Sequence, residues 1–405
     1  MPDTETIIIG GGLAGLACAV RLHEAGRSFC LLEASDGFGG RVRSDKVGGF
    51  TLDRGFQIYL DAYRAAGELL DLAALDLRAF DSGARVFCEG QWRELKDPFR
   101  HPLSALRGAF SPVGNFWDKC LVAKLQLSLL NRSEAAIWDS TDQSTESFLR
   151  DFGFSSSMID DFFRSFYGGI FLERDLETTS RLFQFTFRCF ARGQATLPAE
   201  GMQAIPDQLV ARLPASSLKL ETKVESIAEN RVDIDGGELS AQHIVVATDA
   251  SSARDFDTSL TEPKWKGTTC LHFSAPEPPF RGKLIALQGQ RRGMINNIAL
   301  LSEVAPSYAP LGQSLLAVTL LGIHDTADLE NLVRREMVDW FGPEVADYEC
   351  LRVQHLPRSL PLLSPGPSQS IEYSPIMFAG DYCSHASIEG AVSSGLAVAD
   401  TIISQ

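Results

Sequence analysis

The chain of 405 residues is 44% hydrophobic and 22% charged, which is the composition of an ordinary soluble globular protein. Its length exceeds what one compact core usually organises, so we expect two domains. Its formal net charge of -15 argues against a general nucleic-acid-binding protein, because such proteins carry a basic surface.

The first forty residues follow the order strand, glycine-rich turn, helix and strand. Residues 4–9 form a β-branched run typical of a buried parallel strand, and Gly10-Gly11-Gly12-Leu13-Ala14-Gly15 continues it as a G-x-G-x-x-G motif. Apolar residues at helical spacing then predict a helix that ends at Gly26, and Ser28–Leu32 predicts the next strand. This order is typical of a Rossmann-type unit that binds a dinucleotide. Because the N-terminus enters the strand directly, we expect no signal peptide.

Each part of this motif has a physical role in dinucleotide binding. Gly10 allows a tight turn, Gly12 lets the backbone approach a diphosphate, and Gly15 allows close packing of helix on strand. The unpaired N–H groups of the helix N-terminus attract the negative diphosphate. Glu33, at the end of the second strand, can accept hydrogen bonds from a ribose and would repel a 2′-phosphate, which disfavours NADP. The cofactor contacts expected from this stretch are Gly10, Gly12, Leu13, Ala14, Gly15, Glu33 and Ala34.

The stretch after Glu33 indicates FAD rather than NAD as the cofactor. It contains Gly40-Arg41, and here the sequence resembles the flavin-containing amine oxidase superfamily, which includes protoporphyrinogen oxidases and carotenoid- or squalene-type desaturases. In that superfamily a glycine pair and an arginine wrap the FAD diphosphate, so the resemblance implies this role for Gly40 and Arg41. The stretch 53–57 resembles the family segment beside the isoalloxazine ring. The contacts that this second likeness implies are Gly55, Phe56 and Gln57.

Residues 76–197 are expected to be largely helical. Apolar residues repeat at helical spacing from Ile159 to Phe166, after a capping-box pattern that begins at Ser157. Residues 148–190 hold 11 of the chain's 25 phenylalanines. An aromatic stripe at this spacing is compatible with plain core or with the wall of a pocket for a large apolar substrate.

Residues 97–132 differ in charge from the rest of the chain. They hold five Lys or Arg against two Asp, and apolar residues such as Phe116 and Trp117 lie between them. Two interpretations stay open: an interfacial segment through which a lipid-soluble substrate enters, or a lid packed on its own protein. No apolar run is long enough to cross a membrane, so we expect a cytoplasmic protein with at most peripheral membrane contact.

Residues 198–255 contain a third flavin-related piece. A glycine-containing turn near Gly201 leads into an amphipathic helix and then into a strand that reaches Val224. The resemblance implies that Val224 presents its backbone to the adenine. Residues 244–248 predict a strand that returns to the sheet, which places Ala247 among the expected cofactor contacts.

Residues 256–369 predict an antiparallel sheet that forms the floor of a substrate cavity, which is the arrangement of the superfamily. A helix is expected among its strands, from Leu329 to Phe341. The predicted strands are Thr268–Ser274, Lys283–Gln288, Met294–Leu301, Leu315–Leu321 and Cys350–His355.

The C-terminal residues 378–395 resemble the second flavin-binding element of the superfamily. A helix that begins near Ser387 would point its N-terminus at the flavin, where the positive helix end favours negative charge. The contacts that this likeness implies are Gly380, Asp381, Ser387, Ile388 and Ala391.

These segments together predict an α/β fold with two units. A three-layer, discontinuous Rossmann-type FAD-binding domain is expected from residues 1–75, 198–255 and 370–405. A substrate-binding domain with an antiparallel sheet and a helical subdomain is expected from residues 76–197 and 256–369.

The sequence specifies the reaction less closely than the cofactor. Amine oxidases of the superfamily flank the flavin with an aromatic cage, and one cage tyrosine falls two residues before the glutamate of the final motif, a position that is Ser387 here. This departure favours an FAD-dependent desaturase or oxidase that removes hydride from a C–H bond of a bulky apolar terpenoid or tetrapyrrole. A flavin-dependent amine oxidase, or a flavin protein without net redox such as an isomerase, stays open as an alternative.

The sequence names no catalytic acid or base. His385 lies inside the final motif, but loop histidines are more often solvated or structural. One dinucleotide motif is present, so oxygen, a quinone or another carrier is the expected electron acceptor rather than bound NADPH. The eight cysteines form no C-x-x-C pair and no cluster with histidine, so no metal site is expected.

Overall fold

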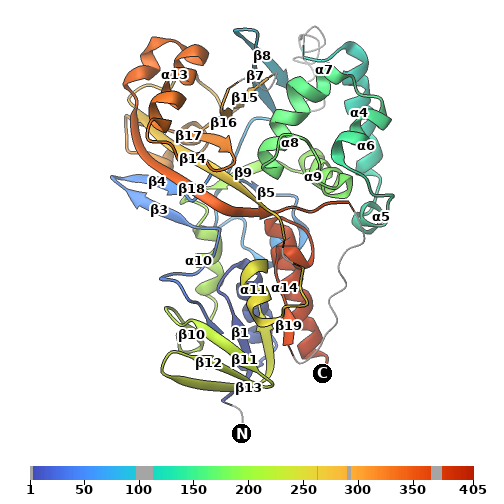
Figure 1. Cartoon of the computed structure of the whole chain (residues 1–405), viewed down its shortest axis with the longest axis vertical. Helices are drawn as coiled ribbons and strands as arrows, with labels where there is room; N and C mark the ends of the chain where they lie inside the picture. Colours follow the sequence, from blue (N-terminus) through green and yellow to red (C-terminus); the bar gives the residue numbers. More distant parts are fainter. Residues whose placement is uncertain (1–2, 97–112, 262, 290–292, 366–375) are drawn as a thin grey trace.

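The protein has two lobes stacked along one axis (Figure 1). The computed structural model describes residues 3–96, 113–261, 263–289, 293–365 and 376–405. The lower lobe contains both chain ends and a mostly parallel sheet with helices beside it. The upper lobe contains an antiparallel sheet with one helix on one side and a group of helices on the other. This mixed architecture confirms the predicted α/β fold class.

The lower sheet joins segments that are far apart in the sequence. Its strand order is β10-β2-β1-β13-β12-β11, with β19 paired to β13. β1 lies between β2 and β13 and pairs parallel with both, so its isoleucines are covered on both faces of the sheet. The strands are β1 (Thr4–Ile9), β2 (Phe29–Leu32), β10 (Leu218–Lys219), β11 (Val224–Ala228), β12 (Arg231–Ile234), β13 (Gly237–Val246) and β19 (Ile376–Phe378).

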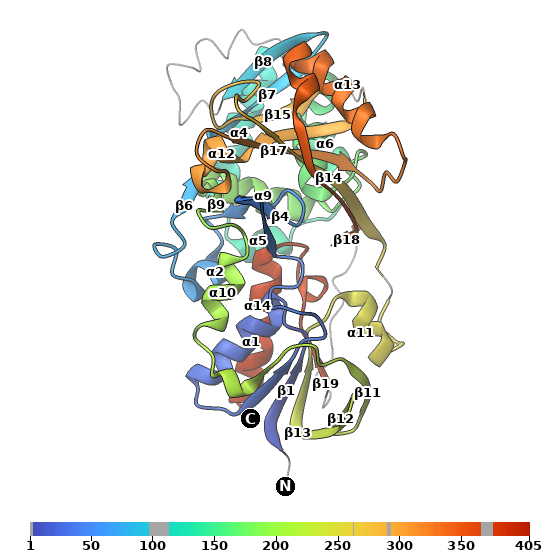
Figure 2. The ribbon, with the colours of Figure 1, turned by 90° about the vertical axis from the view of Figure 1, so that its left-hand side faces the viewer.

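Helices cover one face of the parallel strands, and the antiparallel strands β11 and β12 cover the other. Helices α1 (Leu13–Glu24), α10 (Ala204–Val210) and α14 (Ile388–Ile403) lie on the same side (Figure 2). The α1 and α14 backbones approach closely, because a Cβ added at Gly395 would lie 2.1 Å from the Ala14 carbonyl oxygen. On the other face, residues of β11 and β12 join β1 in a separate apolar core. The lower lobe is therefore a three-layer unit.

The upper sheet has the strand order β18-β14-β17-β16-β15-β7-β8. Its neighbours pair antiparallel except β7 and β15, which are parallel. One face packs against α13 (Leu329–Phe341), with Phe273 and Val318 in contact with the core around Met337. The strands are β7 (Gly83–Cys88), β8 (Gln91–Lys96), β14 (Trp265–Ala275), β15 (Ile285–Gln288), β16 (Ile295–Leu300), β17 (Ser314–Leu321) and β18 (Glu349–Pro361).

The hairpin of β7 and β8 corrects one prediction. Residues 76–197 were expected to be largely helical, yet four strands lie there: β6 (Leu77–Ala79), β7, β8 and β9 (Ala195–Pro198). The hairpin forms because Glu89 and Gly90 both take positive φ, +53° and +73°, in the two-residue turn that joins antiparallel strands. Residues 83–88 also alternate between buried and half-buried, the period of a strand rather than of a helix.

The helix that follows Phe154 has a different N-cap from the one predicted at Ser157. Ser155 is the N-cap and accepts a hydrogen bond from the Met158 N–H, whereas Ser157 donates to Asp161. The helix then continues through Gly168 and Gly169 to Phe171. The elements are α4 (Phe116–Leu130), α5 (Glu134–Trp138), α6 (Thr145–Phe152), α7 (Ser156–Met158), the π-helix η1 (Ile159–Phe163), α8 (Arg164–Phe171) and α9 (Ser180–Arg192).

Shorter elements connect the lobes. A three-stranded sheet has the order β5-β9-β6, and β3 pairs with β4 as a hairpin. The bounds of these elements are β3 (Ser44–Val47), β4 (Phe50–Asp53), β5 (Tyr59–Leu60), α2 (Arg64–Leu69), α11 (Ala250–Phe256) and α12 (Leu301–Val304).

Candidate functional site

One large cavity is lined by both lobes. Its volume is about 1290 Å³, whereas pockets for one drug-sized ligand usually have about 300–1,000 Å³. The cavity therefore has room for two molecules. We call the part lined by residues from 9–57, 222–256 and 356–391 the lower half, and the part lined by residues from 58–195 and 268–319 the upper half.

The structure brings the predicted cofactor residues together in the lower half. Of all of them, Gly15 alone does not line the cavity. Those that line it are Gly10, Gly12, Leu13, Ala14, Glu33, Ala34, Gly40, Arg41, Gly55, Phe56, Gln57, Val224, Ala247, Gly380, Asp381, Ser387, Ile388 and Ala391.

The three glycines of the first motif have different surroundings. Gly10 takes a φ of +107°, and a Cβ there would lie 2.7 Å from the Ala247 carbonyl oxygen. A Cβ on Gly15 would lie 2.0 Å from the Gly10 carbonyl oxygen, so Gly15 serves the packing of α1 on the turn. A Cβ on Gly12 would meet no atom within 4 Å, so the space above Gly12 is open to a ligand. The α1 N-terminus there has no side-chain cap and no acidic residue in its first turn.

Glu33 is held in place at the end of β2. Its Oε2 accepts a hydrogen bond from the Gly11 N–H at 2.7 Å, and its Oε1 accepts one from the Ser35 N–H at 2.8 Å. The Gly39 N–H donates to the Gly11 carbonyl at 2.8 Å, so the loop before Gly40 closes over the glycine turn. Each carboxylate oxygen keeps a further lone pair with which it can accept a hydrogen bond.

An ion pair joins the N-terminal and C-terminal motifs. The Arg41 guanidinium donates to Asp381 Oδ1 at 2.7 Å and to the Ser359 carbonyl at 2.9 Å. Asp381 is buried, whereas the Arg41 side chain is partly exposed to the cavity. Asp381 thus fixes the position of a cation that lines the lower half, at the place where an anionic ligand group would need it.

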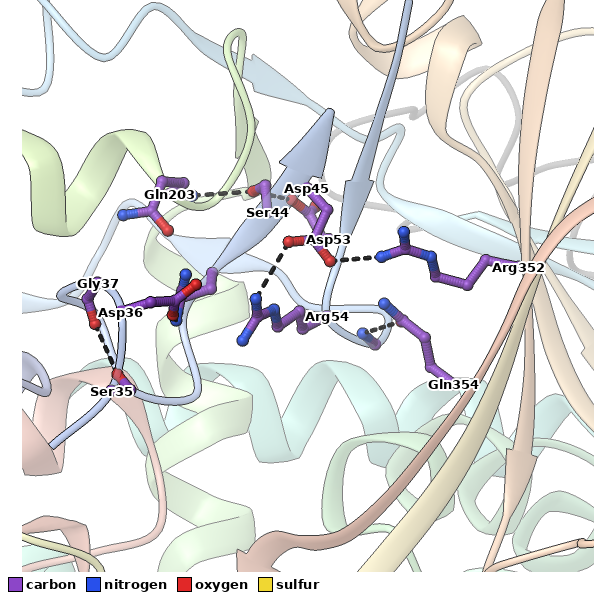
Figure 3. Close-up of polar contacts among 12 residues, drawn as sticks. Ser35, Asp36, Gly37, Ser44, Asp45, Asp53, Arg54, Gln203, Arg352 and Gln354 are labelled. Carbon is purple, nitrogen blue, oxygen red and sulfur yellow. Dashed lines mark hydrogen bonds and ion pairs between the residues drawn. The ribbon is translucent and has the colours of Figure 1, made fainter. Parts of the chain in front are cut away.

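The residues from Asp53 to Gln57 form a loop between the lobes, and strand β18 contacts this loop (Figure 3). Arg54 donates to Asp45 Oδ1 at 3.1 Å, and Arg352 of β18 donates to the second oxygen of the same carboxylate at 2.5 Å. The Gly55 N–H donates to Gln354 Oε1 at 2.9 Å. The upper sheet therefore fixes the loop from one side.

Asp53 is a buried acid behind this loop. It accepts hydrogen bonds from the Ser44 hydroxyl at 2.5 Å, from the Met202 N–H at 3.0 Å and from the Tyr308 hydroxyl at 2.9 Å. Burial raises the pKa of Asp53 to about 6, although its hydrogen bonds favour the ionised form. Tyr308 belongs to the upper lobe, so Asp53 connects the two lobes.

The N-terminus of α14 opens on the cavity. Ser387 is its N-cap and accepts a hydrogen bond from the Gly390 N–H at 3.0 Å. Glu389 does not line the cavity; its carboxylate accepts hydrogen bonds from the Arg64, Ala65 and Ala66 N–H groups at the start of α2, at 2.7–3.0 Å. The glutamate of this motif therefore caps a second helix.

His385 has a structural environment. Its ring stacks on Trp138 at a centroid distance of 5.0 Å and contacts Phe185 at 4.6 Å. Its Nδ1 lies 2.9 Å from the Ser387 hydroxyl. Burial lowers the pKa of His385 to about 4, so the ring is neutral near pH 7. His385 does not line the cavity, and its contacts join α14 to the helical part of the upper lobe.

The upper half of the cavity is apolar and nearly uncharged. Among its described lining residues, Asp81 and Lys119 are the charged ones. Aliphatic and aromatic side chains from α4, α8 and α9 form most of the remaining wall. Three uncharged polar side chains of the sheet, Thr268, Asn297 and Thr319, form part of the floor.

The phenylalanine-rich segment serves both roles that its spacing allowed. Phe183 and Phe185 are buried and do not line the cavity, so they are core. Other rings form the cavity wall, and these are Phe162, Phe163, Phe166, Phe171, Phe187 and Phe190.

Comparison with known proteins agrees with this geometry. A sequence profile for flavin-containing amine oxidoreductases matches residues 13–403. The chain belongs to this family.

Membership in the flavin-containing amine oxidoreductase family confirms the resemblance predicted from the sequence and the flavin cofactor, and it makes the chain an oxidoreductase. A probable flavin-containing monoamine oxidase A from Dictyostelium discoideum is 35% identical over 83 residues, 20% of this chain and 18% of that protein. A phytoene dehydrogenase from Streptomyces griseus is 38% identical over 73 residues, 16% of this chain and 14% of that protein. The chain thus matches less than a fifth of the length of these curated relatives.

Solved structures show the same fold over the whole chain. A protein from Exiguobacterium sp. 255-15, assigned as a protoporphyrinogen oxidase, superposes with a TM-score of 0.77 and 19% identity over 100% of this chain and 99% of that one. At this identity the likeness shows the fold and not the substrate.

The lower half fits the FAD of this family. The open space above Gly12 and the uncapped α1 N-terminus suit a diphosphate, and the Arg41 guanidinium supplies an opposite charge nearby. The Glu33 carboxylate at the end of β2 suits ribose hydroxyls. These features come from backbone geometry and from charged groups, which are the elements that recognise a dinucleotide.

Sequence reasoning missed the polar residues of the upper half and Tyr63. The ring of Tyr63 lines the cavity and stacks on Phe185 at 6.2 Å with an interplanar angle of 5°. Burial raises the pKa of Tyr63, and the neighbouring Ser387 hydroxyl opposes this rise. Tyr63 lies just before the short helix α2, and no local motif marks it.

The segment 97–132 is only partly within the described residues, because 97–112 lie outside them. Its described part, from Val113 onward, contains α4, whose Phe116, Lys119 and Ala123 line the cavity. Among the helices of the described residues, none combines the length and the apolar character needed to cross a membrane.

Proposed function

We propose that this protein is an FAD-dependent desaturase or oxidase that removes hydride from a C–H bond of a bulky apolar substrate of terpenoid or tetrapyrrole type. FAD would occupy the lower half of the cavity, held by the residues of segments 1–75, 198–255 and 370–405. The substrate would occupy the upper half, formed mainly by segments 76–197 and 256–369.

The lining of the upper half carries this proposal. A cationic amine would need a carboxylate or an aromatic cage for its charge, because burying an unpaired charge is costly. Among the described lining residues of the upper half, Asp81 is the only carboxylate, and it is exposed. Rings such as Phe166, Phe187 and Phe190 instead match a large apolar molecule.

The protein's own contribution would be binding, orientation and exclusion of water. When bound, FAD would supply the hydride acceptor. Phe56 and Gln57 would fix the flavin side of the junction, since the Gln57 amide donates to the Arg41 and Arg54 carbonyls at 2.9 Å. The apolar wall of α8 and α9 would hold the reacting carbon and keep water away from it.

Anaerobic titration of the FAD-loaded protein tests the proposal. Phytoene and protoporphyrinogen IX in detergent are the first probes. Loss of the absorbance band of oxidised flavin, at about 450 nm, would be the positive result. Readmission of oxygen, or addition of a quinone, would then identify the electron acceptor. Full retention of the flavin absorbance with both probes, and with other terpenoids of this size, would refute the assignment.

One observation favours the second candidate, an amine oxidase. Tyr63 places a tyrosine ring beside Ser387, the position where amine oxidases of this family carry a cage tyrosine. Putrescine and cyclohexylamine serve as probes in the same titration. Bleaching by these amines, with peroxide formed in air and no response to the apolar probes, would select this alternative.

We also propose that the substrate reaches the cavity from an anionic lipid surface along α4. Phe116 and Trp117 are 60% and 74% exposed, and Leu127 is 54% exposed. Phe116 also lines the cavity, so the exposed apolar surface is continuous with the upper half. Lys119 and Lys124 add positive charge on the same helix in a chain of net charge -15.

Vesicle sedimentation tests this surface. The double variant Phe116→Ser/Trp117→Ser should lose about tenfold in affinity for vesicles that contain phosphatidylglycerol, because two aromatic anchors are removed. Leu311→Ala is the matched control, since Leu311 is fully exposed on a loop that does not line the cavity. Equal vesicle binding of the wild type and the double variant would contradict the proposal.

A further inference from the structure

The floor of the upper half carries a row of uncharged polar side chains. Asn297 of β16, Thr319 of β17 and Thr268 of β14 line the cavity and are 2%, 4% and 5% exposed. The strand register places Asn297 opposite Thr319, and Thr319 opposite Cys270. Three neighbouring strands therefore present this row on one face, in an upper half whose other walls are mostly apolar.

The hydrogen bonds of this row leave donors and acceptors for a ligand. Asn297 Nδ2 donates to Thr319 Oγ1 at 3.3 Å, and Asn297 Oδ1 accepts from Asn296 Nδ2 at 2.9 Å. An amide has two N–H donors and a hydroxyl has one, so one N–H of Asn297 and the O–H of Thr319 have no hydrogen-bond partner among the described residues. Thr268 donates its hydroxyl hydrogen to the Leu320 carbonyl at 2.8 Å, and its oxygen can accept one bond more.

Helix α8 holds the asparagines in position from the other side. A Cβ added at Gly169 would lie 2.9 Å from Asn296 Nδ2 and 3.2 Å from Asn297 Oδ1, so the helix backbone packs directly on both amides. Asn296 Nδ2 also donates to the Ser165 carbonyl at 3.1 Å. Gly169 of α8 is thus required by the asparagine pair of β16, and the polar groups are preorganised before a ligand binds.

The row lies beside the flavin segment. Cys270 is the cross-strand neighbour of Thr319, and its thiol lies near the backbone of Phe56. Phe56 lines the lower half. A group bound by Asn297 and Thr319 would therefore lie one strand away from the junction of the two halves.

We propose that the substrate carries an uncharged oxygen function, a hydroxyl or a carbonyl, and that Asn297 and Thr319 bind it. This inference rests on the proposed function and narrows its substrate class. A pure hydrocarbon would leave the buried N–H and O–H donors without partners, which is costly. A cationic amine would bring a positive charge into the cavity, and no carboxylate among the described lining residues of the sheet would balance it.

Three probes with the same isoprenoid chain test the inference: farnesene, farnesol and farnesylamine. Each is titrated into the FAD-loaded protein, and binding is followed by the change in flavin absorbance and fluorescence. We expect farnesol to bind about tenfold more tightly than farnesene, and farnesylamine to bind more weakly than farnesol. The variants Thr319→Val and Asn297→Leu should each remove most of the farnesol advantage and leave the farnesene affinity within about twofold.

Thr269→Val is the matched control. Thr269 is the next residue on β14, and its hydroxyl bonds to the Gly322 carbonyl instead of lining the cavity. This variant should keep the full preference for farnesol. The flavin content of each variant shows that it is folded, and the nearly isosteric Thr319→Val serves if Asn297→Leu does not fold.

The outcomes separate the two proposals. Equal binding of farnesene and farnesol by the wild type, or an equal loss of both ligands in Thr319→Val, would overturn the role of the polar row while the apolar cavity stands. Absence of binding by farnesene and farnesol together, or tighter binding of farnesylamine than of either, would overturn the proposed function itself.

Discussion

The two halves of the cavity recognise their ligands by different means. The lower half uses backbone and charge: glycines that leave open space, uncapped or serine-capped helix N-termini, and Glu33 and Arg41, each held by a neighbour. The upper half uses side-chain volume, with aromatic rings on helices and a few neutral polar groups on the sheet. A ligand in the lower half is selected by charge and hydrogen-bond geometry, whereas a ligand in the upper half is selected by shape.

This difference explains why the cofactor is better defined than the substrate. Backbone turns and helix ends are encoded by short sequence motifs, so a resemblance over few residues identifies the lower half. The upper half is a surface assembled from several segments, and many combinations of apolar residues give similar shapes. If this difference holds, substitutions in the two halves should have different consequences.

The largest expected effect concerns two phenylalanines one turn apart on α9. Phe183 is buried away from the cavity, so Phe183→Ala should lower the free energy of unfolding by about 3–5 kcal/mol. Phe187 lines the cavity, so Phe187→Ala should cost clearly less stability and change the affinity for farnesol instead. Chemical denaturation and farnesol titration measure the two effects. Equal loss of stability in both variants would mean that the upper wall is ordinary core.

The second prediction concerns Asp53, which joins the lobes. Its folded pKa of about 6 lies above the value of 3.8 expected when unfolded, so the folded protein binds more protons between these values. Stability should therefore fall as pH rises through this window, by on the order of 3 kcal/mol from this group. Asp53→Asn should lack the dependence, so its stability relative to wild type should improve from pH 4 to pH 7.

Urea denaturation of wild type and Asp53→Asn at several pH values checks this sign. Asp400→Asn is a control, because Asp400 pairs with Arg21 on the surface and both side chains are about half exposed. A constant difference between wild type and Asp53→Asn across the range would show that burial does not perturb Asp53 as described.

The third prediction separates two glycines of the same motif. Gly15→Ala should lower the free energy of unfolding by about 1–3 kcal/mol, because the new Cβ would overlap the Gly10 carbonyl oxygen. Gly12→Ala should leave the stability of the FAD-free protein nearly unchanged and weaken FAD binding, since its Cβ projects into open space. Thermal unfolding without cofactor and FAD titration measure the two. Normal FAD binding by Gly12→Ala would place the cofactor elsewhere.

The smallest effect is expected from Asp381→Asn. Loss of the ion pair would leave the Arg41 guanidinium less well positioned, and we expect about tenfold weaker FAD binding. Asp400→Asn removes an exposed ion pair of the same 2.7 Å length and should leave FAD affinity unchanged. The FAD dissociation constants are measured by fluorescence. An unchanged constant in Asp381→Asn would show that Asp381 does not position Arg41 for FAD.

Parts of the fold and of the site could be predicted because their causes are local. The first strand, turn and helix match in detail, since β-branched residues, glycines and helical periodicity act within a few residues. The hairpin at Glu89 and Gly90 was not predicted, because its turn carries only one glycine and so gives a weak turn signal. The Arg41–Asp381 pair could not be foreseen in its geometry, since it joins positions 340 residues apart.

The polar row shows the same limit in the upper half. Asn297 and Thr319 have no motif around them, and only the register of β16 and β17 brings their side chains together. Ser165 and Gly169 complete the arrangement from a helix that the sequence does mark as apolar. Residues that meet through sheet register and helix packing are specified by the whole fold, so inspection of one segment does not reveal them.

The close packing of α14 on α1 has a consequence for synthesis of the protein. Gly395 lets the α14 backbone contact Ala14, so the apolar side of a helix made among the first residues is covered by one made near residue 400. Contacts between such distant positions slow folding, because a long loop must close before they form. During translation the glycine turn therefore emerges long before the elements that complete its surroundings. FAD can therefore bind stably only after residues 376–403 have left the ribosome. Until then, chaperones would protect the exposed early segment.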